Sequence, residues 1–293
     1  MTSVIHNLWK KGLITPPKWL PQNVMYETQM GSEAYGVSSG GSDVDVYGFC
    51  VPLKTLVFPH LEGQIDGFGT QHKRFSQYQE HHVEWQGRSH DLSVYSIIRY
   101  FDLVMQNNPN MIDSLFTPTR CVLYTSAIGE RVRSNRRMFL HKGCWHKFKG
   151  YAYSQLHKMD SKNPIGKRVE TVEQYGWDVK FGYHTVRLML EVEQILMECD
   201  LDLERGREQL KAIRRGEWTP ERVREFFGDK ERDLEKAYQE SELPYKPDEE
   251  KIKELLLDCL RMHYGSLEGV IMVLGSEARA LRQIREILDQ GGW

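Results

Sequence analysis

The sequence predicts an α+β protein, with short strands in its first half and long helices in its second. The composition changes near residue 138. Before this point, short segments rich in β-branched and aromatic residues alternate with glycine and proline. After it, glycine and proline become sparser and helical periodicity appears. At 293 residues and 40% hydrophobic content, the chain is long enough for two modest domains. We therefore divide it into a first domain, 1–137, and a mostly helical domain, 138–293.

Three segments of the first half have the composition of strands: NVMYETQM at 23–30, VDVYGFCV at 44–51 and HHVEWQ at 81–86. Ser93 is placed to cap a helix, because apolar residues recur at helical spacing between Ile97 and Met105. The pair Asn108-Pro109 predicts the end of that helix, because the residue before a proline disfavours helical backbone.

The second half shows helical periodicity in four long stretches: 147–159, 178–198, 219–242 and 249–274. The segment SELPYKPDEE at 241–250 interrupts this pattern with two prolines and predicts a loop between the last two helices. The second half is therefore expected to be mostly helix.

Charge and cysteine usage limit the function classes. A net charge of −2 gives no global basic field, so a nucleic-acid partner needs a local patch. No apolar run approaches the ~18 residues of a membrane span, and the opening MTSVIHNLWKKGL lacks the features of a signal peptide. The five scattered cysteines never occur in CxxC spacing, which predicts reduced thiols and neither a disulfide framework nor a zinc site. We expect a cytoplasmic protein without a membrane partner.

The segment GSEAYGVSSGGSDVDVYG at 31–48 carries the strongest chemical signal. Asp43 and Asp45 are two apart on a predicted strand, so they share one face and repel each other unless a cation lies between them. Gly31-Ser32 follows a predicted strand, where glycine allows a close backbone approach and successive N–H groups can face a phosphate. Paired carboxylates beside a phosphate loop are typical of a magnesium–nucleotide site, with Mn²⁺ as the alternative ion. Taken singly, each motif also fits an ordinary turn or a solvated strand face.

The combination G-S-x-A-Y-G followed by G-S-D-x-D-x-x-G resembles the active-site signature of the DNA polymerase β-like nucleotidyltransferase superfamily. The segments 90–118, 175–196 and 210–223 are similar to the bacteriophage and bacterial group of predicted nucleotidyltransferases within it. This resemblance implies a small mixed-sheet catalytic domain followed by helices. It also implies transfer of a nucleoside monophosphate from an NTP to an acceptor hydroxyl, with release of pyrophosphate.

The resemblance implies a third carboxylate on a neighbouring strand, which would take the acceptor's proton and help to hold the metal. Asp91 is our candidate, because it follows the strand-like 81–86 segment and precedes the expected helix start. A carboxylate there would also stabilise a helix N-terminus without any catalytic role. Glu84 is the second choice, and Asp66, in the turn IDGFG, is a poorer one.

A cluster of three potential cations lies on the expected helix at 178–198. Lys180, His184 and Arg187 stand at positions i, i+4 and i+7, so they share one helical face, where a triphosphate would relieve their repulsion. A solvated basic face is the alternative, and His184 equally fits a buried core histidine. The expected nucleotide contacts are Gly31, Ser32, Ser42, Lys180, His184 and Arg187.

Two weaker clusters lie nearby. Tyr151, Gln155 and Lys158 share a helical face that fits either core packing or contact with a base, ribose or acceptor. Basic residues interleaved with aromatic ones predict RNA binding, or simply a solvated surface, in RVRSNRR at 131–137, in the lysines and histidines of 141–149, and at Lys162, Lys167 and Arg168.

The sequence leaves two alternatives to a nucleotidyltransferase: a degenerate NTP-binding regulatory protein, and an RNA-binding helical module. Within the enzyme class, the acceptor is open among an RNA 3′ end, a protein hydroxyl, a small alcohol and another nucleotide.

Overall fold

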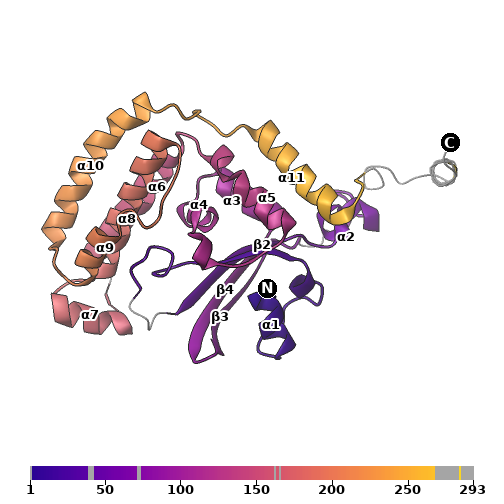
Figure 1. The fold of residues 1–293 in the computed structure, drawn as a ribbon, viewed down its shortest axis with the longest axis horizontal. Helices are drawn as coiled ribbons and strands as arrows, with labels where there is room; N and C mark the ends of the chain where they lie inside the picture. Colours follow the sequence, from indigo (N-terminus) through magenta and orange to yellow (C-terminus); the bar gives the residue numbers. More distant parts are fainter. Residues whose placement is uncertain are drawn as a thin grey trace.

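The structure is a computed structural model that describes residues 2–38, 43–70, 74–161, 163–164, 166–267 and 284, with the side chain of Lys167 also left undescribed. Within these residues the chain forms a five-stranded sheet, with α1 (Val4–Lys10) below it and a larger set of helices above and beside it (Figure 1). The predicted α+β class and the helical second half are confirmed.

The sheet is mixed, because β2 and β4 pair in parallel while the other neighbouring strands pair antiparallel. Its order is β3-β4-β2-β1-β5. The three predicted strands correspond to β1, β2 and β3, whereas β4 and β5 were not predicted. The bounds are β1 Val24–Gln29, β2 Val44–Cys50, β3 Gln77–Trp85, β4 Arg88–Ser96 and β5 Val122–Thr125.

The helix start predicted at Ser93 is wrong, because Ser93 lies inside β4. The cap is Ser96, whose hydroxyl accepts a hydrogen bond from the backbone N–H of Arg99 in α3 (Ile97–Met105). Strand β4 is bonded to β3 on one side and β2 on the other, and this pairing extends the strand through Ser96. The predicted break is confirmed, since Asn108 caps a new helix, α4 (Pro109–Phe116).

The helices after α4 form two groups. Helices α6, α7, α8, α9 and α10 gather beside one end of the sheet, whereas α5 and α11 cover its upper face with α3 (Figure 1). Their bounds are α5 Ala127–Ser134, α6 Cys144–Ser161, α7 Lys167–Tyr175, α8 Val179–Glu198, α9 Arg207–Arg214, α10 Pro220–Glu240 and α11 Glu249–Tyr264. The predicted loop between the last two helices is confirmed, and most of the expected helix beyond Tyr264 lies outside the described residues.

Two hydrophobic cores lie on opposite faces of the sheet. The smaller core includes Ile5 and Leu8 of α1 packed on Val46 and Leu92 of the strands. The larger core is continuous from the sheet's other face into helices α6, α8, α10 and α11. Because one core contains side chains from both halves, the division at residue 137 stays a prediction.

Two expectations about the chain as a whole concern cysteines and membranes. All five cysteines are free thiols, as predicted. Among the helices of the described residues, none combines the length and the apolar character needed to cross a bilayer.

Candidate active site

Two acidic side chains lie side by side on neighbouring strands. The parallel register of β2 and β4 pairs Asp45 directly with Asp91. Val44, Val46 and Leu92 point into the smaller core below the sheet. Because side chains alternate between the two faces of a strand, both carboxylates project from the opposite face, toward the helices.

The charge environment of Asp45 indicates a place for a cation. Burial, the carboxylate of Asp91 and that of Asp43 raise the pKa of Asp45, while the ammonium of Lys180 lowers it. Asp43 lies just before β2 and is exposed. Two carboxylates therefore act on Asp45 here, and a positive group relieves the repulsion.

The backbone at Gly31 lies directly against this carboxylate. Gly31 has a φ of +71°, and a Cβ added there would come within 2.4 Å of Oδ2 of Asp45. The preceding N–H, of Met30, donates to the carbonyl of Asp45 at 2.7 Å. Only glycine fits this conformation and this approach. The loop that begins at Gly31 therefore lies beside Asp45, as predicted. Ser42 lies outside the described residues.

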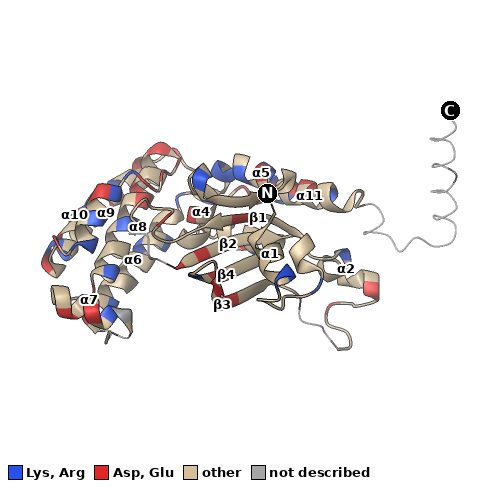
Figure 2. Cartoon of the chain, turned by 60° about the horizontal axis from the view of Figure 1, so that its bottom comes forward, with Lys and Arg blue, Asp and Glu red and all other residues tan. Residues whose placement is uncertain are grey.

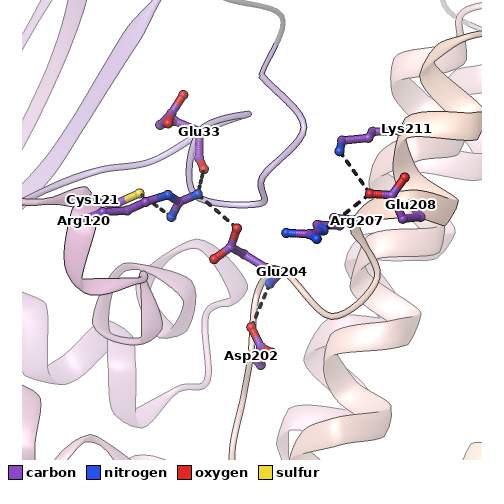
Figure 3. Close-up of polar contacts among 8 residues, drawn as sticks. All are labelled: Glu33, Arg120, Cys121, Asp202, Glu204, Arg207, Glu208 and Lys211. Carbon is purple, nitrogen blue, oxygen red and sulfur yellow. Dashed lines mark hydrogen bonds and ion pairs between the residues drawn. The ribbon is translucent and has the colours of Figure 1, made fainter.

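Residues 31–38 form the loop that begins at Gly31, and contacts from both halves of the chain hold it. Arg120 donates to the carbonyl of Glu33 at 2.9 Å and to Oε1 of Glu204 at 3.1 Å (Figure 3). Arg214 of α9 donates to the carbonyl of Val37 at 2.8 Å. In Figure 3, Arg207 and Lys211 extend from the α9 region toward the same loop, and both contact Glu208. The helices thus fix the backbone of the loop.

Lys180 lies in the first turn of α8, which Asp178 caps by accepting from the N–H of Lys180 at 3.0 Å. The side chain is exposed, yet it is close enough to Asp45 to lower the pKa of that carboxyl. The start of α8 therefore lies near Asp45. Figure 2 shows basic residues on α7, α8 and α9, beside the sheet's acidic positions.

His184 follows one turn later, and of the two roles predicted for it, a cation and a buried core histidine, the structure favours the second. Burial and the cations Arg187, Lys180, Arg168 and Arg214 lower the pKa of His184 well below its usual value. The imidazole is therefore neutral. Two of these cations, Arg168 and Arg214, were not predicted as members of this site; each comes from a different helix, so helical spacing gave no signal.

Arg187 does not present itself to a nucleotide. It is only 5% exposed, and its Nη1 donates to the hydroxyl of Tyr35 at 2.5 Å, to Glu191 at 2.9 Å and to Asp113. Tyr35 in turn donates to Asp113 at 2.7 Å. This burial argues against the predicted phosphate contact. Arg187 instead joins α8 to α4 and to the loop 31–38.

The register favours Asp91 over the other candidates for the third carboxylate. Asp91 lies within β4, not after a strand as expected, and it pairs with Asp45. Glu84 pairs with Ser89 and is exposed. Asp66 lies in the exposed turn between α2 (Lys54–Val57) and β3. The catalytic role of Asp91 stays a prediction.

Most of the predicted basic stretch has partners within the protein. Arg131 pairs with Asp258 at 2.5 Å, and Arg137 pairs with Asp200. Lys149 lies over the ring of Trp145. Further contacts of this kind occur at Arg133, Arg136 and Lys142, whereas Lys162 and the side chain of Lys167 lie outside the described part. These contacts argue against residues 131–149 as an open RNA-binding patch.

The predicted cluster on α6 has one contact of note. The hydroxyl of Tyr151 accepts from the side-chain amide of Asn108 at 3.2 Å, and Tyr151 is 40% exposed. This exposure excludes core packing for the ring. A role for Tyr151, Gln155 and Lys158 in binding a base, ribose or acceptor stays a prediction.

The donor chemistry fits a hard divalent cation, because Asp43, Asp45 and Asp91 offer only oxygen ligands and repel one another. Within the described ranges, which omit 39–42, no three His, Cys, Asp or Glu side chains already lie close enough together to hold a metal ion. The residues thus match Mg²⁺ or Mn²⁺ in kind, and their side chains need to converge further to bind it.

The mixed sheet with paired carboxylates, a glycine-serine loop and a helical second half has the organisation of a polymerase β-type nucleotidyltransferase. The model of the RNA repair pathway DNA polymerase beta family, RlaP, matches residues 13–258, and the chain belongs to this family. The predicted superfamily is thereby confirmed.

No curated protein matches the chain. Among solved structures, a nucleotidyltransferase-like protein from Exiguobacterium sibiricum 255-15 is similar over 98% of this chain and 90% of its own, at 10% identity and a TM-score of 0.28.

Proposed function

We propose that this protein is a metal-dependent nucleotidyltransferase that moves a nucleoside monophosphate from an NTP to an acceptor hydroxyl. One observation carries the proposal: Asp45 and Asp91 are in register on adjacent strands, with Gly31 against one carboxylate and Lys180 acting on it from α8. Family membership supports the same reaction class.

In the proposed reaction, Asp91 accepts the proton of the acceptor hydroxyl. The hydroxyl oxygen then bonds to the α-phosphorus, and the bond from that phosphorus to the pyrophosphate oxygen breaks. The loop at Gly31-Ser32 and the ammonium of Lys180 hold the β- and γ-phosphates in line. Mg²⁺ or Mn²⁺, held by Asp43, Asp45 and Asp91, would supply charge neutralisation on the phosphates. Most of the rate enhancement would come from positioning and electrostatics.

We propose an RNA 3′ end as the acceptor, because the family's description places its members in an RNA repair pathway. Residues 131–149 are not part of this proposal, since most of their charges are paired internally. A cytoplasmic location also belongs to the proposal, and the five free cysteines support it.

An assay with α-³²P-labelled ATP, GTP, CTP and UTP tests the reaction. Each NTP is incubated with the protein, Mg²⁺ or Mn²⁺, and either an RNA with a free 3′ hydroxyl or the same RNA with a blocked 3′ end. Label on the free-ended RNA alone supports the proposal. Label on protein would redirect the acceptor to a side-chain hydroxyl, and NTP binding without transfer would favour a regulatory protein.

A further inference from the structure

A β-bulge lies directly opposite Asp91. The register between β3 and β4 shifts after Glu80 and resumes at Val83, so that His81 and His82 together oppose Asp91. Bulges of this kind re-aim groups and are over-represented next to active sites. The two histidines lie in the strand-like segment 81–86, in which Glu84 was a candidate for the third carboxylate and neither histidine was given a role.

One residue of the bulge has a backbone conformation that is uncommon outside glycine. His82 has a φ of +57°, in the left-handed region that non-glycine residues rarely adopt. Gln86 has a similar φ of +52°, but it forms the two-residue turn of the β3–β4 hairpin with Gly87, where such values are usual. His82 is within the strand, so the hairpin does not explain its conformation. Strain of this sort persists where other interactions require it.

The interactions of the bulge converge on one carboxylate oxygen. The backbone N–H of His82 donates to Oδ1 of Asp91 at 2.9 Å. Nδ1 of His81 lies 3.5 Å from the same oxygen, and Nδ1 of His82 lies 3.9 Å from it. Both imidazoles are exposed, with side-chain exposures of 59% and 85%. The short contact is therefore made by the strained backbone, not by a ring.

We propose that His82 is a positioning residue for Asp91: the bulge aims its N–H at Oδ1, which fixes the carboxylate and presents Oδ2 to the acceptor hydroxyl and the metal. This inference rests on the proposed function, in which Asp91 touches the reacting atoms. It assigns the effect to the backbone of His82, so the identity of the side chain matters only through the conformation that it allows.

A series of substitutions separates the backbone from the ring. His82→Gly keeps the N–H and favours a positive φ, His82→Ala disfavours it, and the β-branched His82→Val disfavours it most. Gln86→Val is the matched control, because it places the same residue at a similar φ in the same hairpin, away from Asp91. Each variant is measured for Mn²⁺ affinity by electron paramagnetic resonance, for kcat and KM of transfer, and for Tm.

We expect wild type and His82→Gly to have the same Mn²⁺ affinity and the same kcat. Both quantities should be lower in His82→Ala and lowest in His82→Val. The full loss should be on the order of 10–100-fold, the usual effect of removing a group that orients a metal ligand. KM for the NTP should stay constant. Gln86→Val should lower Tm without changing the Mn²⁺ affinity or kcat. If His82→Val fails to fold, comparing His82→Gly with His82→Ala still shows whether Mn²⁺ affinity and kcat depend on the backbone conformation.

Three outcomes would overturn the inference. One is a His82→Val protein that matches Gln86→Val in metal affinity and kcat. Another is a His82→Gly protein as impaired as His82→Val, which would assign the effect to the imidazole. The third is a wild-type protein that binds no Mn²⁺, which would remove both the inference and the proposed function. A wild type that binds Mn²⁺ but transfers no nucleotide would contradict only the proposed function, because Mn²⁺ affinity still tests the bulge.

Discussion

Glu27 is an acidic residue buried in the sheet, where it stabilises the start of α1. Its two carboxylate oxygens accept from the backbone N–H groups of Val4 at 2.6 Å and Ile5 at 3.0 Å. Burial raises the pKa of Glu27 to about 7, and these hydrogen bonds only partly oppose the shift. The folded protein therefore holds this proton more tightly than the unfolded chain does.

This shift predicts a pH-dependent stability. The contribution of Glu27 is fully present below its unfolded pKa of 4.5 and is lost as pH rises through about 7. We expect Glu27 alone to cost wild type about 3 kcal/mol of unfolding free energy between pH 4.5 and pH 8. Glu27→Gln stays neutral and should lack this loss. Urea denaturation of both proteins across this range measures it, and parallel pH profiles would contradict the assignment.

Single site residues could be predicted from the sequence where their partners lie close to them in the chain. Asp43, Asp45 and Gly31 lie within 15 residues of one another, so strand alternation and a glycine turn were enough to bring them together. Arg187 depends on Asp113, 74 positions earlier, and no local pattern shows that pairing. The bulge at His82 was equally hidden, because it follows from the register of two strands.

At the scale of elements, β1, β2 and the long helices were predictable because their periodicity is intrinsic. Strand β4 was not, because its first residues are polar and Ser93 has the residue type of a helix cap. Hydrogen bonding to β2 and β3 on both sides overrides that local preference. The missed strand is the one that carries Asp91, which explains why the third carboxylate was placed after a strand instead of within one.

Helix α8 gives the second prediction, which concerns Lys180 at its start. If its ammonium contacts the triphosphate, Lys180→Ala should weaken Mg·NTP binding by about 1–3 kcal/mol, the range for hydrogen bonds to charged groups. Thermal stability without ligand should barely change, because the side chain is exposed. Calorimetric titration of ATP and GTP measures the affinity.

The matched control for Lys180 is Lys236→Ala, an exposed lysine on α10. The affinity of Lys236→Ala for Mg·NTP should equal that of wild type. Equal affinities for all three proteins would mean that α8 does not complete the nucleotide pocket, and Lys180 would have to be withdrawn from the site.

At the scale of the whole molecule, the two halves are joined by polar contacts as well as by the shared core. The cluster of Arg187, Tyr35, Asp113 and Glu191 connects the loop 31–38, α4 and α8 in the interior. Burial raises the pKa of both Asp113 and Glu191, and the guanidinium of Arg187 opposes this shift. Removing that guanidinium leaves two buried carboxyl groups without their cation.

We therefore expect Arg187→Met to lower the free energy of unfolding by about 3–5 kcal/mol, the usual cost of breaking a buried pair from one side. Arg131→Met removes a pair with Asp258 that is 44% and 40% exposed, so its cost should stay below about 1 kcal/mol. Chemical denaturation compares the two. Equal small losses would show that the interior cluster does not join the halves.

The central claim is that the acidic pair on β2 and β4 performs nucleotidyl transfer, and Asp45→Asn tests it most directly. The substitution removes a proposed metal ligand, and the raised pKa of Asp45 shows that its charge is unfavourable in the folded state, so Tm at pH 8 should not fall. The measurement is transfer of label from α-³²P-NTP, beside Asp66→Asn as an exposed control. We expect transfer to be abolished in Asp45→Asn and unchanged in Asp66→Asn. Wild-type turnover by a folded Asp45→Asn protein would contradict the account.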